Sequence, residues 1–461
     1  MTGTMLLTRP GPRPPEAAPG QPAAGRPSTR VRWPEIAVAA AGFAALCALV
    51  LTKATSMLEP DDYAYQASIV ALSQGHVLLT TAQYHQLSRS LGDGGTSIPQ
   101  WVHLPDGRWM SQKNPGYPFL AVVFYVIGAL RLAPLFYGAL ASGALFVGAR
   151  RWLGAWGGTI AVLLFCTSGA AITFAWRPTM ETFTDASLVA AGAGLLLWTM
   201  LATDAPQRRR LVAGLGAFLA LEAATFTRYT DVLELVVAAA VALLLARRCG
   251  LRWRTVGAWM ATVAASGVGV LAFNAVVYGA PLRTGYASGL ISFSFTAIGP
   301  NLVHMPWKLV AAMPVAVVAG AAVLWIVGRA LAPELDLPVD RADVPARRRD
   351  VAVALALVGG WIAMWGLYLA YTWTVGQAGA DPVHVVRFYV PALGPVALLA
   401  AWALVRLPVV VWAAAVLALL GAGVASFHVM SAAGGPGGGP LGHLPGSGGL
   451  PGGPGGPGGS A

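Results

Sequence analysis

Two adjacent aspartates, Asp61 and Asp62, follow the first hydrophobic segment of the chain, in the stretch Pro60-Asp61-Asp62-Tyr63-Ala64-Tyr65. Carboxylates are costly near lipid, so a pair of them where a membrane span meets water indicates a functional site. Such a carboxylate could remove a proton from a hydroxyl at the membrane surface. The alternative is that the pair caps a helix, where Asp is favoured by unpaired backbone N–H groups. A cap explains one aspartate but not two, and position alone leaves both interpretations open.

Further charged residues are predicted at the same side of the membrane. Lys113 precedes the rigid turn Asn114-Pro115-Gly116-Tyr117-Pro118; it is either a snorkelling anchor or a group that holds a phosphate at headgroup depth. Glu181 and Asp185 are four residues apart and share one helix face. Their position at the outer end of a span favours a hydrated cavity over lipid.

Four arginines also fall on this outer side, against the usual distribution of positive charge. They need a partner, which a phosphate bound through two hydrogen bonds would supply. The alternative is pairing with acidic side chains of the protein, namely Glu181, Asp231 or Asp381. The four arginines are Arg177, Arg228, Arg283 and Arg387.

Histidine gives a weaker signal for a metal site. The chain has seven histidines, and none has a spacing such as His-x-x-His that is typical of metal ligands. A divalent ion held by His384 and an acid is an alternative. We expect no metal or cofactor to be required.

The composition identifies the elements that must position these residues. Hydrophobic residues make up 56% of the chain and charged residues 11%, with a mean hydropathy of +0.64, whereas a soluble domain has roughly 25% charged residues. We predict an all-α polytopic membrane protein with about 11 transmembrane helices, since spans need about 17–25 residues each. The predicted spans are 35–52, 119–149, 156–175, 180–202, 211–226, 232–246, 256–276, 307–328, 351–372, 389–405 and 408–428, with Arg131 and Pro134 dividing 119–149 into a short interfacial helix and a span.

The net charge of +11 follows the membrane topology. Arginine clusters lie between alternate spans, which assigns them to the cytoplasm and excludes a nucleic-acid partner. This predicts a disordered cytoplasmic segment 1–34, a transmembrane domain 35–430 whose long outer loop 53–118 contains interfacial helices, and a disordered Gly/Pro-rich tail 431–461. The clusters are Arg150-Arg151, Arg208-Arg209-Arg210, Arg247-Arg248 with Arg252 and Arg254, Arg347-Arg348-Arg349, and Arg406.

Taken together and in order, these motifs resemble the type C glycosyltransferase superfamily (GT-C). The chain is most similar to the dolichyl-phosphate-mannose protein mannosyltransferase and aminoarabinose-transferase branch, over about residues 35–405. Departures are Asp62 where Glu is commoner, Phe388 where Tyr is usual, and no large soluble C-terminal domain. The stretches that carry the resemblance are Asp61-Asp62-Tyr63-Ala64-Tyr65, Lys113-Asn114-Pro115-Gly116-Tyr117-Pro118, Asn274 to Tyr286, and Arg387-Phe388-Tyr389-Val390-Pro391.

The resemblance implies a sugar donor on a polyprenyl phosphate that enters laterally from the lipid, and a glycan, lipid or protein acceptor. Asp61 would be the general base with Asp62 beside it, and Glu181 or Asp185 would complete the acidic group. Donor phosphate would be held by Lys113, Arg228, Arg387 and Tyr389, and substrate would be contacted by Tyr65, Tyr117, Arg177, Arg283 and Tyr286.

We therefore expect a glycosyltransferase in a bacterial plasma membrane, with its active site on the extracytoplasmic side. A transporter or flippase for polyprenyl-linked lipids is the alternative from another class, and a catalytically inactive GT-C relative is a third. Against transport, the charged residues gather at one side of the membrane, whereas transporter sites lie near its midplane.

Overall fold

The computed structural model describes residues 32–53, 60–91, 97–286, 291–331, 344–379 and 382–433. Most of the predicted N-terminal segment, most of the Gly/Pro-rich tail, and Asp381 lie outside these residues. At both boundaries the helical domain is slightly longer than predicted, because its first helix begins at Trp33 and its last ends at Ala433.

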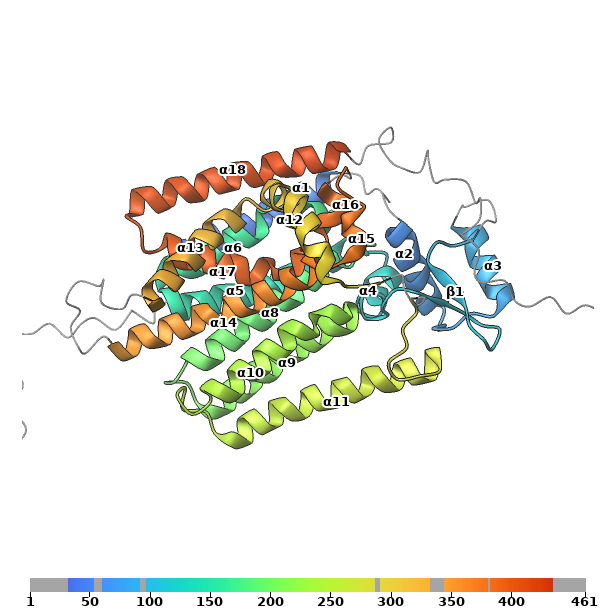
Figure 1. Ribbon diagram of the computed structural model, residues 1–461, viewed down its shortest axis with the longest axis horizontal. Coiled ribbons are helices and arrows are strands. Elements are labelled where there is room, and N and C mark those ends of the chain that lie inside the picture. The colour runs from blue at the N-terminus through green and yellow to red at the C-terminus, as the bar shows by residue number, and fades with distance from the viewer. Residues whose placement is uncertain are drawn as a thin grey trace, which may run out of the picture.

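The described chain is almost entirely helical (Figure 1). One antiparallel hairpin is formed by β1 (Trp101–His103) and β2 (Trp109–Ser111), and two short 3-10 helices are η1 (Tyr229–Asp231) and η4 (Val390–Ala392). The α-helices are α1 (Trp33–Thr52), α2 (Pro60–Ser73), α3 (Thr81–Ser90), α4 (Gly116–Val126), α5 (Leu132–Leu153), α6 (Ala155–Cys166), α7 (Gly169–Ala175), α8 (Thr182–Leu201), α9 (Gln207–Thr227), α10 (Val232–Leu245), α11 (Trp253–Tyr278), α12 (Phe295–Ala312), α13 (Val315–Leu331), α14 (Val344–Leu369), α15 (Thr372–Val375), α16 (Pro382–Val386), α17 (Leu393–Leu404) and α18 (Val409–Ala433).

Within these described residues, seven helices are long and apolar enough to cross a membrane, or up to nine if two bent pairs each form one span. The bent pairs are α6 with α7, at 59°, and α12 with α13, at 113°. Two further predicted spans, 232–246 and 389–405, fall on the shorter α10 and on η4 with α17. A multi-pass helical membrane protein is confirmed, while the count of eleven stays a prediction.

The predicted division of 119–149 is confirmed, since α4 ends at Val126 and α5 begins at Leu132. Arg131 stands at this break and donates hydrogen bonds to the backbone carbonyls of Val50 and Lys53, at 2.9 and 2.5 Å. An arginine at the end of a span can bind the unpaired carbonyls of a neighbouring helix end in this way.

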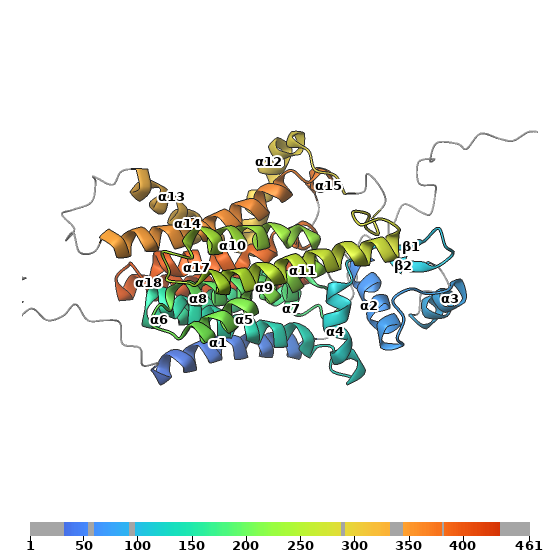
Figure 2. The same ribbon diagram turned by 90° about the horizontal axis from the view of Figure 1, so that it is seen from below.

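The basic clusters gather at one end of the helix bundle. Arg150 pairs with Glu35 at the start of α1, and Arg151 pairs with Asp204 just after α8. Arg406 and Asp350 form a 2.6 Å ion pair between the end of α17 and the start of α14. Figure 2 shows the starts of α1 and α14 at this same end. The arrangement agrees with the predicted pattern of crossings, and we call this the basic end.

The opposite end carries a small lobe made by α2, α3 and the β1–β2 hairpin (Figures 1 and 2). The helix α3 begins at a capping box in which Thr80 and Gln83 satisfy each other's backbone N–H groups. Inside the lobe, Tyr84 stacks on Trp109 with ring centroids 3.9 Å apart. The predicted interfacial helices of the loop 53–118 are therefore present, and the hairpin was not predicted.

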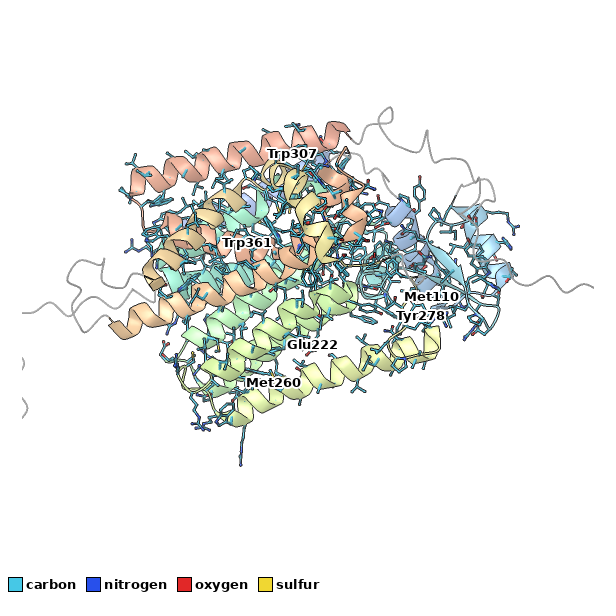
Figure 3. All side chains as sticks on the ribbon, viewed as in Figure 1. Met110, Glu222, Met260, Tyr278, Trp307 and Trp361 are labelled. Carbon is cyan, nitrogen blue, oxygen red and sulfur yellow. The ribbon has the colours of Figure 1, made fainter. Side chains whose placement is uncertain are left out.

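The hairpin is joined to the bundle through the end of α11. Met110 of β2 packs against Tyr278 (Figure 3), and the Tyr278 hydroxyl donates a 3.3 Å hydrogen bond to the carbonyl of Ser111. Gly279, at a φ of 82°, ends α11 in the left-handed conformation that glycine adopts without strain. These contacts fix the chain around Ser111, two residues before Lys113.

Candidate active site

Asp61 lies at the centre of the charged residues at the lobe end. Its Oδ2 atom is 2.9 Å from Lys113 Nζ and 3.0 Å from a terminal nitrogen of Arg387. Its Oδ1 atom accepts a 2.7 Å hydrogen bond from the Gln100 side chain. Burial alone would raise the pKa of Asp61, but the charges of Arg387 and Lys113 outweigh it and hold that pKa below its usual range. Asp61 is therefore ionised at neutral pH.

Asp62 is held differently from its neighbour. One carboxylate oxygen pairs with Arg177, and the other accepts a 3.0 Å hydrogen bond from the Thr179 hydroxyl. Both Asp62 and Arg177 have no exposed surface. A buried carboxylate with both oxygens occupied is a poor proton acceptor. Asp62 therefore anchors α2 to the turn between α7 and α8, residues 176–179, which we call the Arg177 turn.

A second group of charges surrounds Arg228, which follows α9. Its guanidinium is 2.5 Å from an oxygen of Glu181 and 3.4 Å from an oxygen of Asp185. It also donates a 3.1 Å hydrogen bond to the backbone carbonyl of Arg387, which joins this group to the Asp61 group. The resulting ionic cluster has four acids and four bases, namely Asp61, Asp62, Glu181, Asp185, Lys113, Arg177, Arg228 and Arg387.

Three of the four outer arginines thus pair with carboxylates, as the pairing alternative predicted. Arg177 binds Asp62, Arg228 binds Glu181 and Asp185, and Arg387 binds Asp61. The partners differ from those expected, apart from Glu181. Capping does not account for the aspartate pair either: both lie in the first turn of α2, and their carboxylates bind side chains of distant segments.

Two glycines let the surrounding backbone approach closely enough to form the cluster. A methyl group on Gly116 would overlap the backbone of Phe226 and Thr227, so a larger residue would push α4 away from the end of α9. A methyl on Gly285 would lie 2.7 Å from the Cα of Gln112. That contact brings the Tyr286 ring over Lys113, with Nζ 5.6 Å from the ring centroid.

Three tyrosines that the resemblance assigned to the site are buried, and they differ in what they contact. Tyr65 and Tyr117 are buried and pack edge to face, with centroids 5.7 Å apart. The Tyr117 hydroxyl donates to the carbonyl of Pro178, which links α4 to the Arg177 turn. Tyr389 is fully buried among Trp365 and Tyr368, and its hydroxyl has no hydrogen-bond partner among the described residues.

Arg283 is the predicted site residue that the structure places apart from the cluster. It is exposed in the turn after α11, and its backbone N–H bonds to Ala280. The resemblance covered the whole stretch from Asn274 to Tyr286. In the structure this stretch places Tyr286 beside Lys113, whereas Arg283 is exposed.

Sequence reasoning missed Gln100, and overlooked Thr179 as a ligand of Asp62. Gln100 has a φ of 58°, a left-handed conformation that is uncommon for residues other than glycine. Its carbonyl accepts a 2.8 Å hydrogen bond from the N–H of Gln112, while its side chain binds Asp61. No motif in the sequence signalled this residue, because its role depends on the unpredicted hairpin.

Asp231, considered only as an arginine partner, adds a further buried carboxyl beside the cluster. Burial, together with the neighbouring Asp185 carboxylate, raises the pKa of Asp231. A raised pKa favours the neutral form of Asp231 beside the four acids and four bases of the ionic cluster.

One small cavity adjoins the cluster. A cavity of about 20 Å³ lies beside Lys113, lined by residues of α2, the hairpin and α4. No group of three or more His, Cys, Asp or Glu side chains in the described ranges is arranged to hold a metal ion.

The geometry defines a class of protein: a multi-pass helical membrane protein with a buried, charge-balanced cluster at one end of its helices. No family model matches the chain, and no curated protein sequence matches it.

Two solved structures resemble it. One is ArnT from Cupriavidus metallidurans in the apo state, at 16% identity and a TM-score of 0.48, covering 82% of this chain and 60% of that one. The other is the same protein bound to undecaprenyl phosphate, at 18% identity and a TM-score of 0.46, covering 82% and 61%. This chain thus spans about 60% of their length. The likeness is too distant to assign an activity, and the roles of the cluster rest on its own chemistry.

Proposed function

We propose that this chain is a glycosyltransferase that moves a hexose or pentose from a polyprenyl-phosphate donor to an acceptor hydroxyl. The reaction takes place at the lobe end of the bundle, on the extracytoplasmic face of a bacterial plasma membrane. The observation that carries the proposal is the contact of Lys113 and Arg387 with the same oxygen of Asp61. Each of two potential phosphate-binding cations is thus held within hydrogen-bond distance of a potential base.

The three residues have complementary roles in an inverting displacement. The acceptor oxygen attacks the anomeric carbon as the bond from that carbon to the phosphate oxygen breaks. Asp61 takes the acceptor proton, and Lys113 and Arg387 stabilise the charge that builds on the leaving phosphate. Both cations can do so without a metal ion, because the leaving group is a monophosphate.

Without a donor, Asp61 is a weak base, since the two cations stabilise its charged form. A donor phosphate competes with Asp61 for the same two cations. When they turn to the phosphate, the pKa of Asp61 rises toward its ordinary value and the carboxylate becomes a better proton acceptor. Donor binding therefore activates the base, and the acceptor is deprotonated only when the donor is present.

The second group of charges, around Arg228, holds Arg387 in position. Arg228 holds the Arg387 backbone through a 3.1 Å hydrogen bond and is itself fixed by Glu181. Glu181 and Asp185 thus hold Arg228 in position. Arg228 contacts the phosphate only in addition to Lys113 and Arg387. A glycan or a lipid-linked acceptor is the one that we propose.

The experiment that tests the proposal uses purified protein in proteoliposomes with a panel of polyprenyl-phosphate sugars and a cell-envelope glycan acceptor. A transferase releases polyprenyl phosphate and labels the acceptor. A flippase instead exposes intact donor to a membrane-impermeant reagent without cleaving it. Donor that is bound but neither cleaved nor moved would indicate an inactive relative and contradict the proposal.

A further inference from the structure

A long cavity in the described part of the chain begins at Glu234, three residues after Asp231, and extends from there toward the basic end. It has a volume of about 850 Å³ and is enclosed mainly by α8, α10 and α14, with single residues from α9 and α17. That volume is in the range of ligand sites, about 300–1,000 Å³. Its lining is apolar apart from Cys249 and two charged side chains, Glu234 and Arg248.

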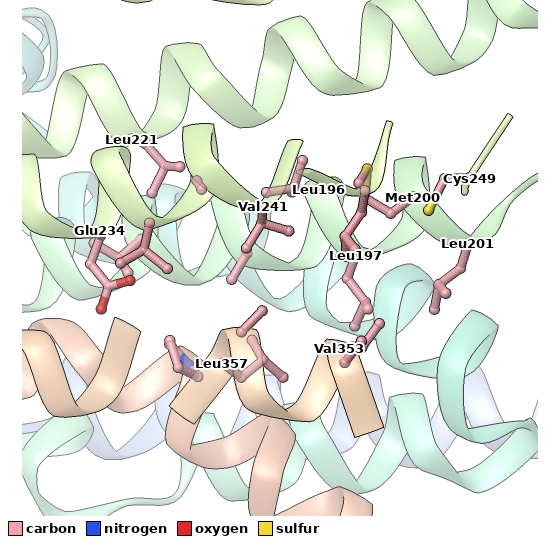
Figure 4. Close-up of a pocket in the computed structure, with 18 of the residues that line it drawn as sticks. Leu196, Leu197, Met200, Leu201, Leu221, Glu234, Val241, Cys249, Val353 and Leu357 are labelled. Carbon is pink, nitrogen blue, oxygen red and sulfur yellow. The ribbon is translucent and has the colours of Figure 1, made fainter. Parts of the chain in front are cut away.

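The cavity is long and runs parallel to the helices. Its lining from α10 starts at Glu234, continues through Val237, Val241 and Leu245, and reaches Arg248 in the following turn. At a rise of about 1.5 Å per residue, the 11 steps from Glu234 to Leu245 alone span roughly 16 Å. Figure 4 shows Glu234 at one end and Cys249 at the other, with Leu196 and Val241 between them. This shape suits a hydrocarbon chain.

The two ends of the cavity differ in charge. Glu234 is 7% exposed, and its Oε1 atom has no hydrogen-bond partner. Gly360 of α14 leaves the space that this carboxyl occupies. A negative group of a ligand is disfavoured here, because it would meet another acid in an apolar surrounding.

Arg248 lines the opposite end, in a turn that is held in place and rich in positive charge. Arg210 donates hydrogen bonds to the carbonyls of Cys249 and Gly250, at 2.7 and 3.3 Å. Arg247 precedes Arg248 in the same turn. Basic pockets between transmembrane helices bind anionic lipid head groups. A phosphate at Arg248 would have its apolar chain directed into the cavity.

We infer that this cavity binds an anionic phospholipid, with its phosphate at Arg248 and a hydrocarbon chain extending toward Glu234. The head group then lies at the basic end, whereas Lys113 and Arg387 lie at the lobe end. The site is thus distinct from the proposed donor site and does not depend on the proposed function.

The test uses delipidated protein in detergent, titrated with phosphatidylglycerol or with phosphatidylcholine of the same chains, and bound lipids counted by native mass spectrometry. The wild type is expected to retain one phosphatidylglycerol. Arg248→Gln should weaken that binding roughly tenfold, the effect of losing one hydrogen bond to a charged group. The matched control Arg252→Gln, an exposed arginine of the same loop outside the cavity lining, should bind as the wild type does.

A second pair of variants tests whether the lipid's hydrocarbon chain occupies the cavity. Ala356→Phe places a ring in the cavity and should abolish retention, whereas Leu355→Phe, on the exposed side of the same helix, should not. If Ala356→Phe does not fold, the two arginine variants decide alone. Equal weakening by Arg248→Gln and Arg252→Gln would overturn the inference, as would full retention in folded Ala356→Phe. Retention that depends on Lys113 and Arg387 would assign the cavity to the donor's chain and also overturn it.

Discussion

Lys113 and Arg387, from opposite parts of the sequence, converge on a single atom, Oδ2 of Asp61, at 2.9 and 3.0 Å. All three side chains are more than nine-tenths buried. Two cations that share one carboxylate oxygen are placed to accept a phosphate instead, because phosphate offers more oxygens and more charge than a carboxylate.

Removal of either cation should impair turnover more than folding. We expect Arg387→Gln to lower the rate of sugar transfer by at least about 100-fold, since it deletes a donor that stabilises the leaving phosphate. Arg283→Gln is the matched control, because Arg283 is exposed and lies apart from the ionic cluster. Transfer rates of the two variants, measured at saturating donor, check this. Equal losses in both variants would contradict the assignment of Arg387, because they would show that an arginine outside the ionic cluster matters as much.

The Arg177–Asp62 pair should matter for stability. Arg177→Met leaves a buried carboxylate uncompensated, which typically costs about 3–5 kcal/mol. The exposed pair Arg108–Asp106 offers a control, since solvent screens such a pair and Arg108→Met should leave the unfolding midpoint nearly unchanged.

The measurement is the thermal unfolding midpoint in detergent. The double variant Arg177→Met with Asp62→Leu should recover part of the lost stability, because it removes the uncompensated charge. No recovery in a well-folded double variant would mean that Arg177 stabilises the fold through contacts other than Asp62.

The pH dependence of turnover should differ between the free protein and the donor complex. In the free protein the pKa of Asp61 is depressed, so Asp61 stays ionised well into the acidic range and kcat/KM should show no acid limb from it at mild pH. In the donor complex the cations bind phosphate, and the acid limb of kcat should appear at higher pH. Coinciding limbs in the two profiles would argue against activation of the base by the donor.

The same shift makes a prediction about folding. The folded-state pKa of Asp61 lies below the unfolded value of about 3.9. Its ion pairs therefore contribute their full stability above that unfolded value, and this contribution is lost as the pH falls through the folded-state pKa. Wild type and Asp61→Asn should consequently become more alike in unfolding midpoint as the pH is lowered. A difference that stays constant down to strongly acidic pH would mean that Asp61 does not contribute through its charge.

The close approach of α4 to α9 should be necessary for the position of Lys113. Gly116→Ala should lower both the unfolding midpoint and the transfer rate, because the added methyl overlaps the backbone of Phe226 and Thr227. Gly143→Ala serves as the control: Gly143 lies in α5 with open space around it, and alanine is the better helix former. If Gly116→Ala keeps full activity and stability, the backbone contact is less tight than described.

Much of the architecture could be predicted from the sequence because its signals are local. Apolar segment length located the spans, and the break at Arg131 was visible as a charge and a proline within an apolar run. The alternation of arginine clusters predicted their common end, which the Arg150–Glu35 and Arg406–Asp350 pairs confirm.

The site could be predicted in its residue types but not in its pairings. The sequence singled out Asp61, Lys113 and Arg387, yet which acid binds which base depends on helix packing. Gln100 escaped notice because its contact with Asp61 requires a hairpin of two three-residue strands, too short for a periodic signal.

Glu222 and Glu234 were missed because each occurs singly in an apolar helix. Glu222 of α9 accepts a 2.6 Å hydrogen bond from Ser266 of α11 and lies between these helices in Figure 3. Glu222 lies in the last two turns of α9 and Glu234 in the first turn of α10, so both are near the helix ends that carry the ionic cluster.

The most direct test of the central claim compares Asp61→Asn with wild type in donor binding and in single-turnover release of polyprenyl phosphate. The amide cannot accept the proton and no longer holds the two cations by charge. We predict that Asp61→Asn binds the donor at least as tightly as wild type and releases polyprenyl phosphate at least about 100-fold more slowly. Asp106→Asn, an exposed aspartate of the same lobe, should match wild type in both. Undiminished release by a folded Asp61→Asn protein would contradict the assignment of Asp61 as the base.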